Sequence, residues 1–222
     1  MAIVWPCPLS VDAYAAAGRD VEFPRPDCPE CGSVMTFWSG YRRHVRTAGR
    51  CQQIFVPRTR CQRCGATHVL LPSFLLAGRL DVAETVGSVL SEVVDDPCGV
   101  RPAAERCEVP HTTARGWLRR FSARATNIAV SFAALAVELG GDVVTPGEDA
   151  RSFALGAVRA AFRAASALPG WRSIGLWRFA SAVSGGRLLA TNTDSPYLVV
   201  GRRRFMPPVP SLTTTTEESH GI

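Results

Sequence analysis

The stretches CPECG (residues 28–32) and CQRCG (residues 61–65) decide the fold of the first part of this chain. Each holds two cysteines separated by two residues, with a glycine directly after the second cysteine. That spacing lets both sulfur atoms of one turn reach a single ion at a Zn–S distance of about 2.3 Å. The glycine permits the positive φ with which the chain leaves the turn. Together the two stretches predict a tetrahedral zinc site formed by four cysteines: Cys28, Cys31, Cys61 and Cys64.

Zinc in such a site is expected to be structural, because four thiolates fill the tetrahedron and leave no position for a water molecule. A thioredoxin-like redox role is disfavoured, since there are two such motifs and no βαβ pattern around them. His44, Cys51 and His68 lie nearby in the sequence. We interpret them as ordinary strand residues rather than as ligands.

The sequence around the cysteines predicts strands. Short strand-like runs at 36–38, 42–46 and 53–60 indicate a small, strand-rich zinc ribbon over residues 28–74. The proline-containing segment 1–27 is expected to be an irregular N-terminal lead-in.

Beyond the ribbon the apolar spacing becomes helical, and residues 80–125 are expected to form a helix-turn-helix domain. A first helix is predicted over 82–94. The stretch GVRPAAERCEVPHTTARGWLRRFSARA (residues 99–125) predicts two more helices around a tight turn, at 102–107 and 112–124. An ordinary amphipathic helical hairpin with a solvated basic face is the alternative interpretation.

The helical pattern continues through a C-terminal region, residues 126–200, with helices expected at 127–139, 152–168 and 174–183. Their apolar residues either pack against the helix-turn-helix or form a homodimer interface. The polar segment 207–222, rich in proline and threonine, is expected to be a disordered tail. The expected fold is therefore α+β and mainly helical: a small strand-rich zinc ribbon with four cysteine ligands, then a helix-turn-helix domain, then C-terminal helices.

The basic residues are concentrated in two segments. All 25 are arginine, which a GC-rich genome explains, and the formal net charge is +6. Residues 28–68 hold seven arginines and one acid, and residues 111–125 hold four arginines and no acid. Two basic segments on an otherwise acidic-to-neutral chain indicate a polyanionic partner, and we expect double-stranded DNA.

The candidate DNA contacts come from these segments. In helix-turn-helix proteins the N-terminal part of the second helix enters the major groove. The candidates for base contact are Thr112, Thr113 and Arg115. The candidates for phosphate contact are Arg119, Arg120 and Arg124 on the same helix, and Arg42, Arg43, Arg46, Arg58 and Arg60 on the ribbon.

Targeting signals and catalytic motifs are not apparent in the sequence. There is no secretory signal and no apolar run long enough to span a membrane. We therefore expect a cytoplasmic, nucleoid-associated protein whose eight cysteines do not form disulfides. The acids after residue 125 lie in helical or tail-like sequence, without the strand-rich core on which transposase carboxylates hold two metal ions. We expect no enzymatic activity.

Five segments resemble a family of uncharacterised bacterial proteins, mostly actinobacterial, which carry a domain of unknown function similar to the zinc-ribbon and helix-turn-helix parts of transposases. The segments are WPCPL (5–9), CPECG (28–32), FWSGYRRHVR (37–46), RTRCQRCGATHVLLPSFLLAGRLD (58–81) and GVRPAAERCEVPHTTARGWLRRF (99–121). The resemblance implies a zinc-bearing DNA-binding protein associated with mobile elements. In this chain Cys107 and Glu108 stand where many helix-turn-helix sequences carry an apolar residue and a glycine.

The residues and the resemblance together predict a DNA-binding protein with a structural zinc ion, acting as an accessory or regulatory factor related to mobile elements. Two alternatives remain open. One is a protein-interaction module that docks a transposase or a polymerase. The other is a degenerate transposase subunit.

Overall fold

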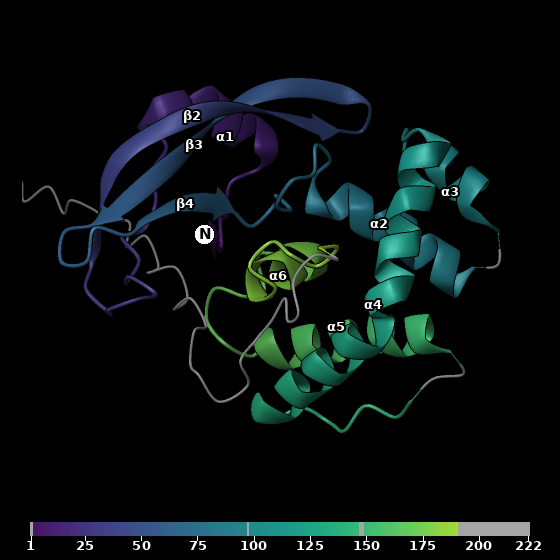
Figure 1. The fold of residues 1–222 in the computed structure, drawn as a ribbon. Coiled ribbons are helices and arrows are strands. Elements are labelled where there is room, and N and C mark those ends of the chain that lie inside the picture. Colours follow the sequence, from purple (N-terminus) through teal and green to yellow (C-terminus); the bar gives the residue numbers. More distant parts are fainter. Residues whose placement is uncertain (1, 97, 147–148, 191–222) are drawn as a thin grey trace, which may run out of the picture.

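The computed structural model describes residues 2–96, 98–146 and 149–190 (Figure 1). The predicted tail, 207–222, lies outside the described residues, as does the end of the predicted C-terminal region, 191–200. The fold class is confirmed as α+β. A four-stranded mixed sheet with the cysteine cluster lies near the N-terminus, and a helical part follows it.

The sheet has the strand order β1-β4-β3-β2. Strands β2 (Met35–Thr47) and β3 (Arg50–Cys61) form a long antiparallel hairpin, and β4 (Thr67–Pro72) pairs antiparallel with β3. Strand β1 (Ala2–Trp5) pairs parallel with β4, so β2 is an edge strand.

The prediction of an irregular lead-in over 1–27 was wrong. Besides β1, this segment forms helix α1 (Val11–Ala17), which begins where the hydroxyl of Ser10 accepts a hydrogen bond from the amide of Ala13, and a 3-10 turn (Gly18–Asp20). Its buried side chains complete the core under the sheet, where the rings of Tyr14 and Phe74 meet edge to face. A four-residue strand has too short a pattern to be recognised before its distant partner is known.

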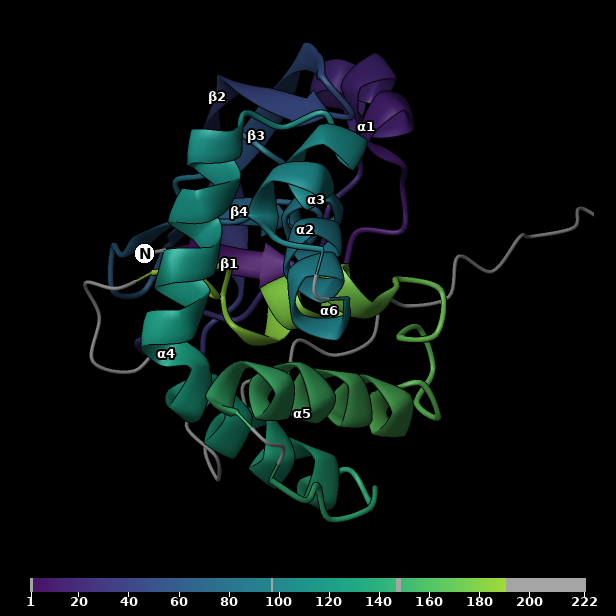
Figure 2. The ribbon, with the colours of Figure 1, turned by 90° about the vertical axis from the view of Figure 1, so that its right-hand side faces the viewer.

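The helical part begins with α2 (Ala83–Asp95), α3 (Val100–Arg106) and α4 (His111–Glu138), which pack against one another. Helices α5 (Ala150–Ala165) and α6 (Leu176–Val183) follow. Figure 2 shows α3 beside the N-terminal part of α4, with α5 further down. None of the helices in the described part of the chain combines the length and apolar character needed to cross a membrane.

The two helices expected at 112–124 and 127–139 are one continuous helix, α4. The polar residues Thr126 and Asn127 lie on its exposed side and do not end it. Ala125, Ile128 and Phe132 carry its buried stripe through the expected break. The apolar residues of the two predicted helices thus form one continuous buried stripe along α4.

The apolar residues of α5 and α6 lie in the chain's own core. Leu155 and Val158 of α5 are buried there, and the ring of Phe179 of α6 meets that of Trp171 edge to face. A β-carbon on Gly87 of α2 would overlap the indole of Trp177, so this glycine permits the close approach of α6. Core packing therefore accounts for most of the apolar residues of these two helices.

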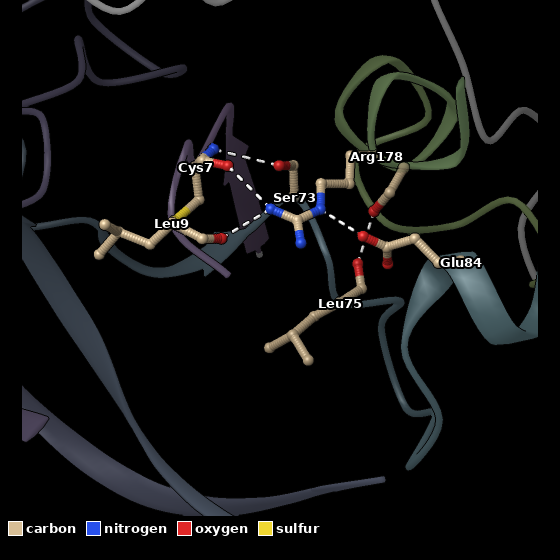
Figure 3. Close-up of polar contacts among 7 residues, drawn as sticks. Cys7, Leu9, Ser73, Leu75, Glu84 and Arg178 are labelled. Atoms are coloured by element: carbon tan, nitrogen blue, oxygen red, sulfur yellow. Dashed lines mark hydrogen bonds and ion pairs between the residues drawn. The ribbon is translucent and has the colours of Figure 1, made fainter. Parts of the chain in front are cut away.

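Helix α6 also joins the helical part to the N-terminal segment (Figure 3). The guanidinium of Arg178 donates hydrogen bonds to the carbonyls of Cys7 (3.3 Å) and Leu9 (2.7 Å), and it pairs with the carboxylate of Glu84 on α2. The hydroxyl of Ser73 accepts a hydrogen bond from the amide of Cys7 at 3.1 Å. One arginine thus links three segments that are far apart in the sequence.

Candidate metal centre and nucleic-acid interface

The four predicted cysteines form one cluster. Their sulfur atoms all lie within 4.8 Å of one another, with Cys28 and Cys64 3.5 Å apart and Cys31 and Cys61 3.4 Å apart. A tetrahedral zinc ion with Zn–S bonds of about 2.3 Å would hold its sulfurs about 3.8 Å apart. The cysteines are therefore arranged so that they could hold a metal ion such as zinc, with only a small adjustment.

The two cysteine turns have the same backbone geometry. In each, the amide of the glycine donates to the carbonyl of the first cysteine, at 2.8 Å for Gly32 and 3.0 Å for Gly65. Both glycines have φ 75°, as the sequence predicts. The amides of Cys28 and Cys61 are bonded to carbonyls five residues onward, those of Ser33 and Ala66. These repeated hydrogen bonds shape the turns, so the site is largely preformed by local structure.

The thiols of the cluster titrate differently. The backbone and side chain of Ser33 hydrogen-bond to Cys31 and lower its pKa to about 6. The amide of Ala66 lowers the pKa of Cys64, but burial and the neighbouring thiols outweigh it and raise that pKa to about 12. Metal ligation requires thiolates, so uptake of an ion here would release protons.

His44, Cys51 and His68, which lie near the cysteines in the sequence, are not part of the cluster. The sulfur of Cys51 lies 3.8 Å from Nδ1 of His44 on the exposed side of the hairpin. His68 is buried on β4, opposite Thr59 of β3. Within the described ranges, no second group of three or more metal-binding side chains occurs.

Helices α3 and α4 are joined by the tight turn that the sequence predicts. The amide of Val109 donates to the carbonyl of Ala104 at 2.9 Å, and that of Glu108 donates to the carbonyl of Glu105 at 3.1 Å. This pair of hydrogen bonds is typical of a helix C-terminus that is followed by a residue in the left-handed conformation. Glu108 is that residue, with φ 53°. It adopts the left-handed conformation that glycine adopts without steric cost.

The predicted contact residues on α4 fall into three groups. Thr112, Arg115 and Arg119 are exposed, and their spacing of three and four residues places them along one side of the helix. Thr113 and Arg120 are partly buried, and the guanidinium of Arg120 donates to the carbonyl of Gly116 at 3.0 Å. The third group is Arg124 alone.

Arg124 does not fit the predicted phosphate contact. It is only 6% exposed and donates a hydrogen bond to the carbonyl of Ala190. The sequence carries the reason, because Arg124 lies three residues after Phe121 and seven after Trp117, on their buried side of the helix. A guanidinium that is buried and bonded to the chain's own backbone is not presented to a DNA phosphate.

Two of the ribbon arginines are also used within the chain. The guanidinium of Arg43 donates to the carbonyls of Leu76 and Arg79, and burial lowers its pKa. Arg46 forms an ion pair with the buried carboxylate of Asp81. Both hold the hairpin against the segment that leads into α2, so neither is available as the predicted phosphate contact.

The other three predicted contacts on the ribbon are exposed or partly exposed. Arg42 is exposed and donates to the side chain of Gln53 at 3.2 Å. The guanidinium carbons of Arg58 and Arg60 each lie 5.6 Å from the ring centroid of Trp38. Trp38 is 51% exposed. It is a surface feature that the sequence reasoning missed, although the alternation of aromatic residues and arginines in FWSGYRRHVR was visible.

Residues 28–117 match a protein family described as "Domain of unknown function (DUF6431)". The match begins at the first cysteine of the cluster and ends in the first part of α4. It thus spans the cluster, the hairpin and the turn between α3 and α4. The search of curated proteins and the search of solved structures found no match.

Proposed function

We propose that this chain is a DNA-binding protein that reads duplex DNA with the N-terminal part of α4, while a structural zinc ion in the cysteine cluster shapes the hairpin beside it. The zinc is proposed as structural because four thiolates satisfy its tetrahedral preference. The genetic role that we propose is that of an accessory or regulatory factor related to mobile elements.

The observation that carries the proposal is the exposed stripe formed by Thr112, Arg115 and Arg119. It starts at the first turns of the second helix of a helix-turn-helix, where such proteins contact base edges. No acidic residue occurs from 111 to 125. Phosphates approaching this side of α4 therefore meet guanidinium groups and no carboxylate of the same segment.

The contact between the hairpin and the helical turn supports one shared surface. A β-carbon on Gly49, at the tip of the β2–β3 hairpin, would lie 2.6 Å from Oε2 of Glu108. The tip of the hairpin therefore abuts the turn between α3 and α4, as Figure 1 also shows. The two basic segments of the sequence belong to one body rather than to separate ends of an extended chain.

A salt titration of duplex binding tests the proposal. Six arginines that are exposed or partly exposed remain candidates for phosphate contact: Arg42, Arg58, Arg60, Arg115, Arg119 and Arg120. If about four to six phosphates are neutralised, the logarithm of the association constant should fall with that of salt at a slope of about −4 to −5. The measurement is fluorescence anisotropy with labelled duplexes selected from a random pool.

Two substitutions separate base reading from charge. Arg119→Ala should weaken the selected duplex and a random duplex about equally, whereas Arg115→Ala should relax the preference between them by about 1–3 kcal/mol. Arg163→Ala is the control, because this arginine is exposed on α5 outside both basic segments. Absence of duplex binding at low salt would refute the proposal and favour a protein-interaction module.

A further inference from the structure

We propose that the outer part of β2 is a second nucleic-acid surface, on which Trp38 stacks with an unpaired base of single-stranded DNA beside the side chains of Arg58 and Arg60. This inference goes beyond the duplex-reading role proposed for α4. Trp38 is not among the proposed duplex contacts, although Arg58 and Arg60 serve both proposals. Substitutions at Trp38 and at Arg119 therefore allow each proposal to fail without the other.

The exposed aromatic residues on β2 are the first observation. Trp38 is 51% exposed and Phe37 is 54% exposed, and both lie near the start of β2, at the open end of the hairpin. The pairing register shifts between Phe37 and Ser39, so Trp38 is the extra residue of a β-bulge. Bulges on edge strands interrupt pairing and change the direction of a side chain. Here the bulge presents an indole ring at a free edge of the sheet.

The charges around Trp38 are the second observation. Arg58 and Arg60 both lie over its ring, and neither forms an ion pair with an acidic side chain of the described residues. The sequence contains no acid from residue 31 to residue 80. The two guanidinium groups are therefore not neutralised by nearby carboxylates of their own strand, and they remain able to attract a phosphate backbone.

A hollow beside Phe37 is the third observation. It is open to solvent, has a volume of about 570 Å³, and is lined by Phe23, Arg25, Thr36 and Phe37, with Glu22 as its acid. The rings of Phe23 and Phe37 are 5.8 Å apart. Aromatic walls with hydroxyl and guanidinium groups suit a flat, polar base. The hollow, whose lining includes Thr59 but not Trp38, Arg58 or Arg60, offers a separate place for a second base.

The chemistry favours a single strand over a duplex or a protein. Within a duplex each base is covered by its neighbours, so an exposed indole finds no free base face there. Unpaired bases stack readily on aromatic side chains, and arginines follow the backbone in such sites. A protein partner for an exposed indole would bring apolar side chains, which the arginines on this ring do not match.

Binding of the zinc-loaded full chain to labelled oligothymidine tests the inference. Trp38→Ala should weaken that binding about 10- to 100-fold, the effect expected for one stacked base. Trp38→Phe should restore most of the affinity, because a phenyl ring also stacks. Duplex binding should change less than about twofold in either variant, since duplex reading is assigned to α4. Zinc content and circular dichroism establish that each variant is folded.

Two controls make the result decisive. Val34→Ala shortens another exposed apolar residue of the ribbon, 58% exposed, and should leave oligothymidine binding unchanged. Arg119→Ala should impair duplex binding and spare the single strand. The inference is overturned if Trp38→Ala binds oligothymidine as tightly as the unmodified chain, or if it weakens duplex and single strand equally. Loss of duplex binding alone, with stacking intact, would refute only the function proposed for α4.

Discussion

The side chain of Arg46 on β2 forms two parallel hydrogen bonds with the carboxylate of Asp81, from Nε to Oδ1 at 2.6 Å and from Nη2 to Oδ2 at 2.9 Å. Backbone bonds flank this pair, because the amide of Arg46 donates to the carbonyl of Leu80 and the amide of Val82 donates to the carbonyl of Arg46. The hairpin is thereby fastened to the residues that lead into α2.

Removing the carboxylate should destabilise the chain. Asp81 is 3% exposed and the Arg46 side chain is 21% exposed, so Asp81→Ala leaves a mostly buried guanidinium without its partner. We expect the free energy of unfolding to fall by about 2–4 kcal/mol, measured by chemical denaturation. The control is Asp12→Ala, which removes an exposed pair with Arg50 at 3.8 Å and should cost less than about 1 kcal/mol. Equal losses in the two variants would contradict a special role for the Arg46–Asp81 pair.

Metal content should depend on the cluster cysteines alone. Cys61→Ser removes one of four thiolates, and the variant should lose its zinc and the folded structure of the ribbon, because binding and folding are coupled in small metal sites. Cys51→Ser is the matched control, since Cys51 lies on the same strand but is exposed and outside the cluster. It should keep one zinc per chain in elemental analysis. Stoichiometric zinc in Cys61→Ser would refute the ligand assignment.

Stability should fall at alkaline pH, in part through Cys7. Burial raises the pKa of this thiol from 9.0 to about 11. Between these values the unfolded chain has released a proton that the folded chain still holds, so rising pH favours unfolding. This thiol lowers the free energy of unfolding by up to about 1.4 kcal/mol per pH unit in that range. Its stabilising contribution is fully present below about pH 9.

Denaturation of Cys7→Ala at pH 8 to 11 measures this contribution. The free energy of unfolding of this variant should fall less steeply with pH than that of the unmodified chain. Some decrease will remain, because burial also raises the pKa of Tyr14. A variant that removes the exposed thiol, Cys51→Ala, should keep the original slope. An unchanged slope in Cys7→Ala would contradict the prediction.

Glycine should be preferred to glutamate at the turn between α3 and α4. A non-glycine residue in the left-handed region costs about 1–2 kcal/mol, of which the greater flexibility of unfolded glycine returns about 0.5–1. Glu108→Gly should therefore raise the free energy of unfolding by about 0.5–1 kcal/mol, measured with urea. Glu105→Gly, inside α3, should lower it by about 1 kcal/mol. Destabilisation by Glu108→Gly would mean that its contact with the hairpin tip outweighs the backbone cost.

Local patterns in the sequence predicted the cysteine cluster, the fold class and the turn between α3 and α4. Each of these depends on residues a few positions apart or on repeated turns, where spacing alone sets the geometry. The buried position of Arg124 belongs with them, because its separation from Trp117 and Phe121 already places it on the inner side of α4. The signal was present, and the positive charge of the residue drew attention away from it.

Contacts between distant segments were decided only by the tertiary structure. Strand β1 exists because Ala2–Trp5 meets β4, some 67 residues later, and neither segment alone specifies that pairing. Arg43 and Arg46 differ from Arg58 and Arg60 only in what the folded chain brings to them: carbonyls and a carboxylate for the first pair, an exposed indole for the second. The sequence by itself determined which local turns and helices form and where positive charge is concentrated. The tertiary structure decided which of those charges the chain satisfies internally, because an ion pair or a buried hydrogen bond depends on neighbours in space rather than on neighbours along the chain.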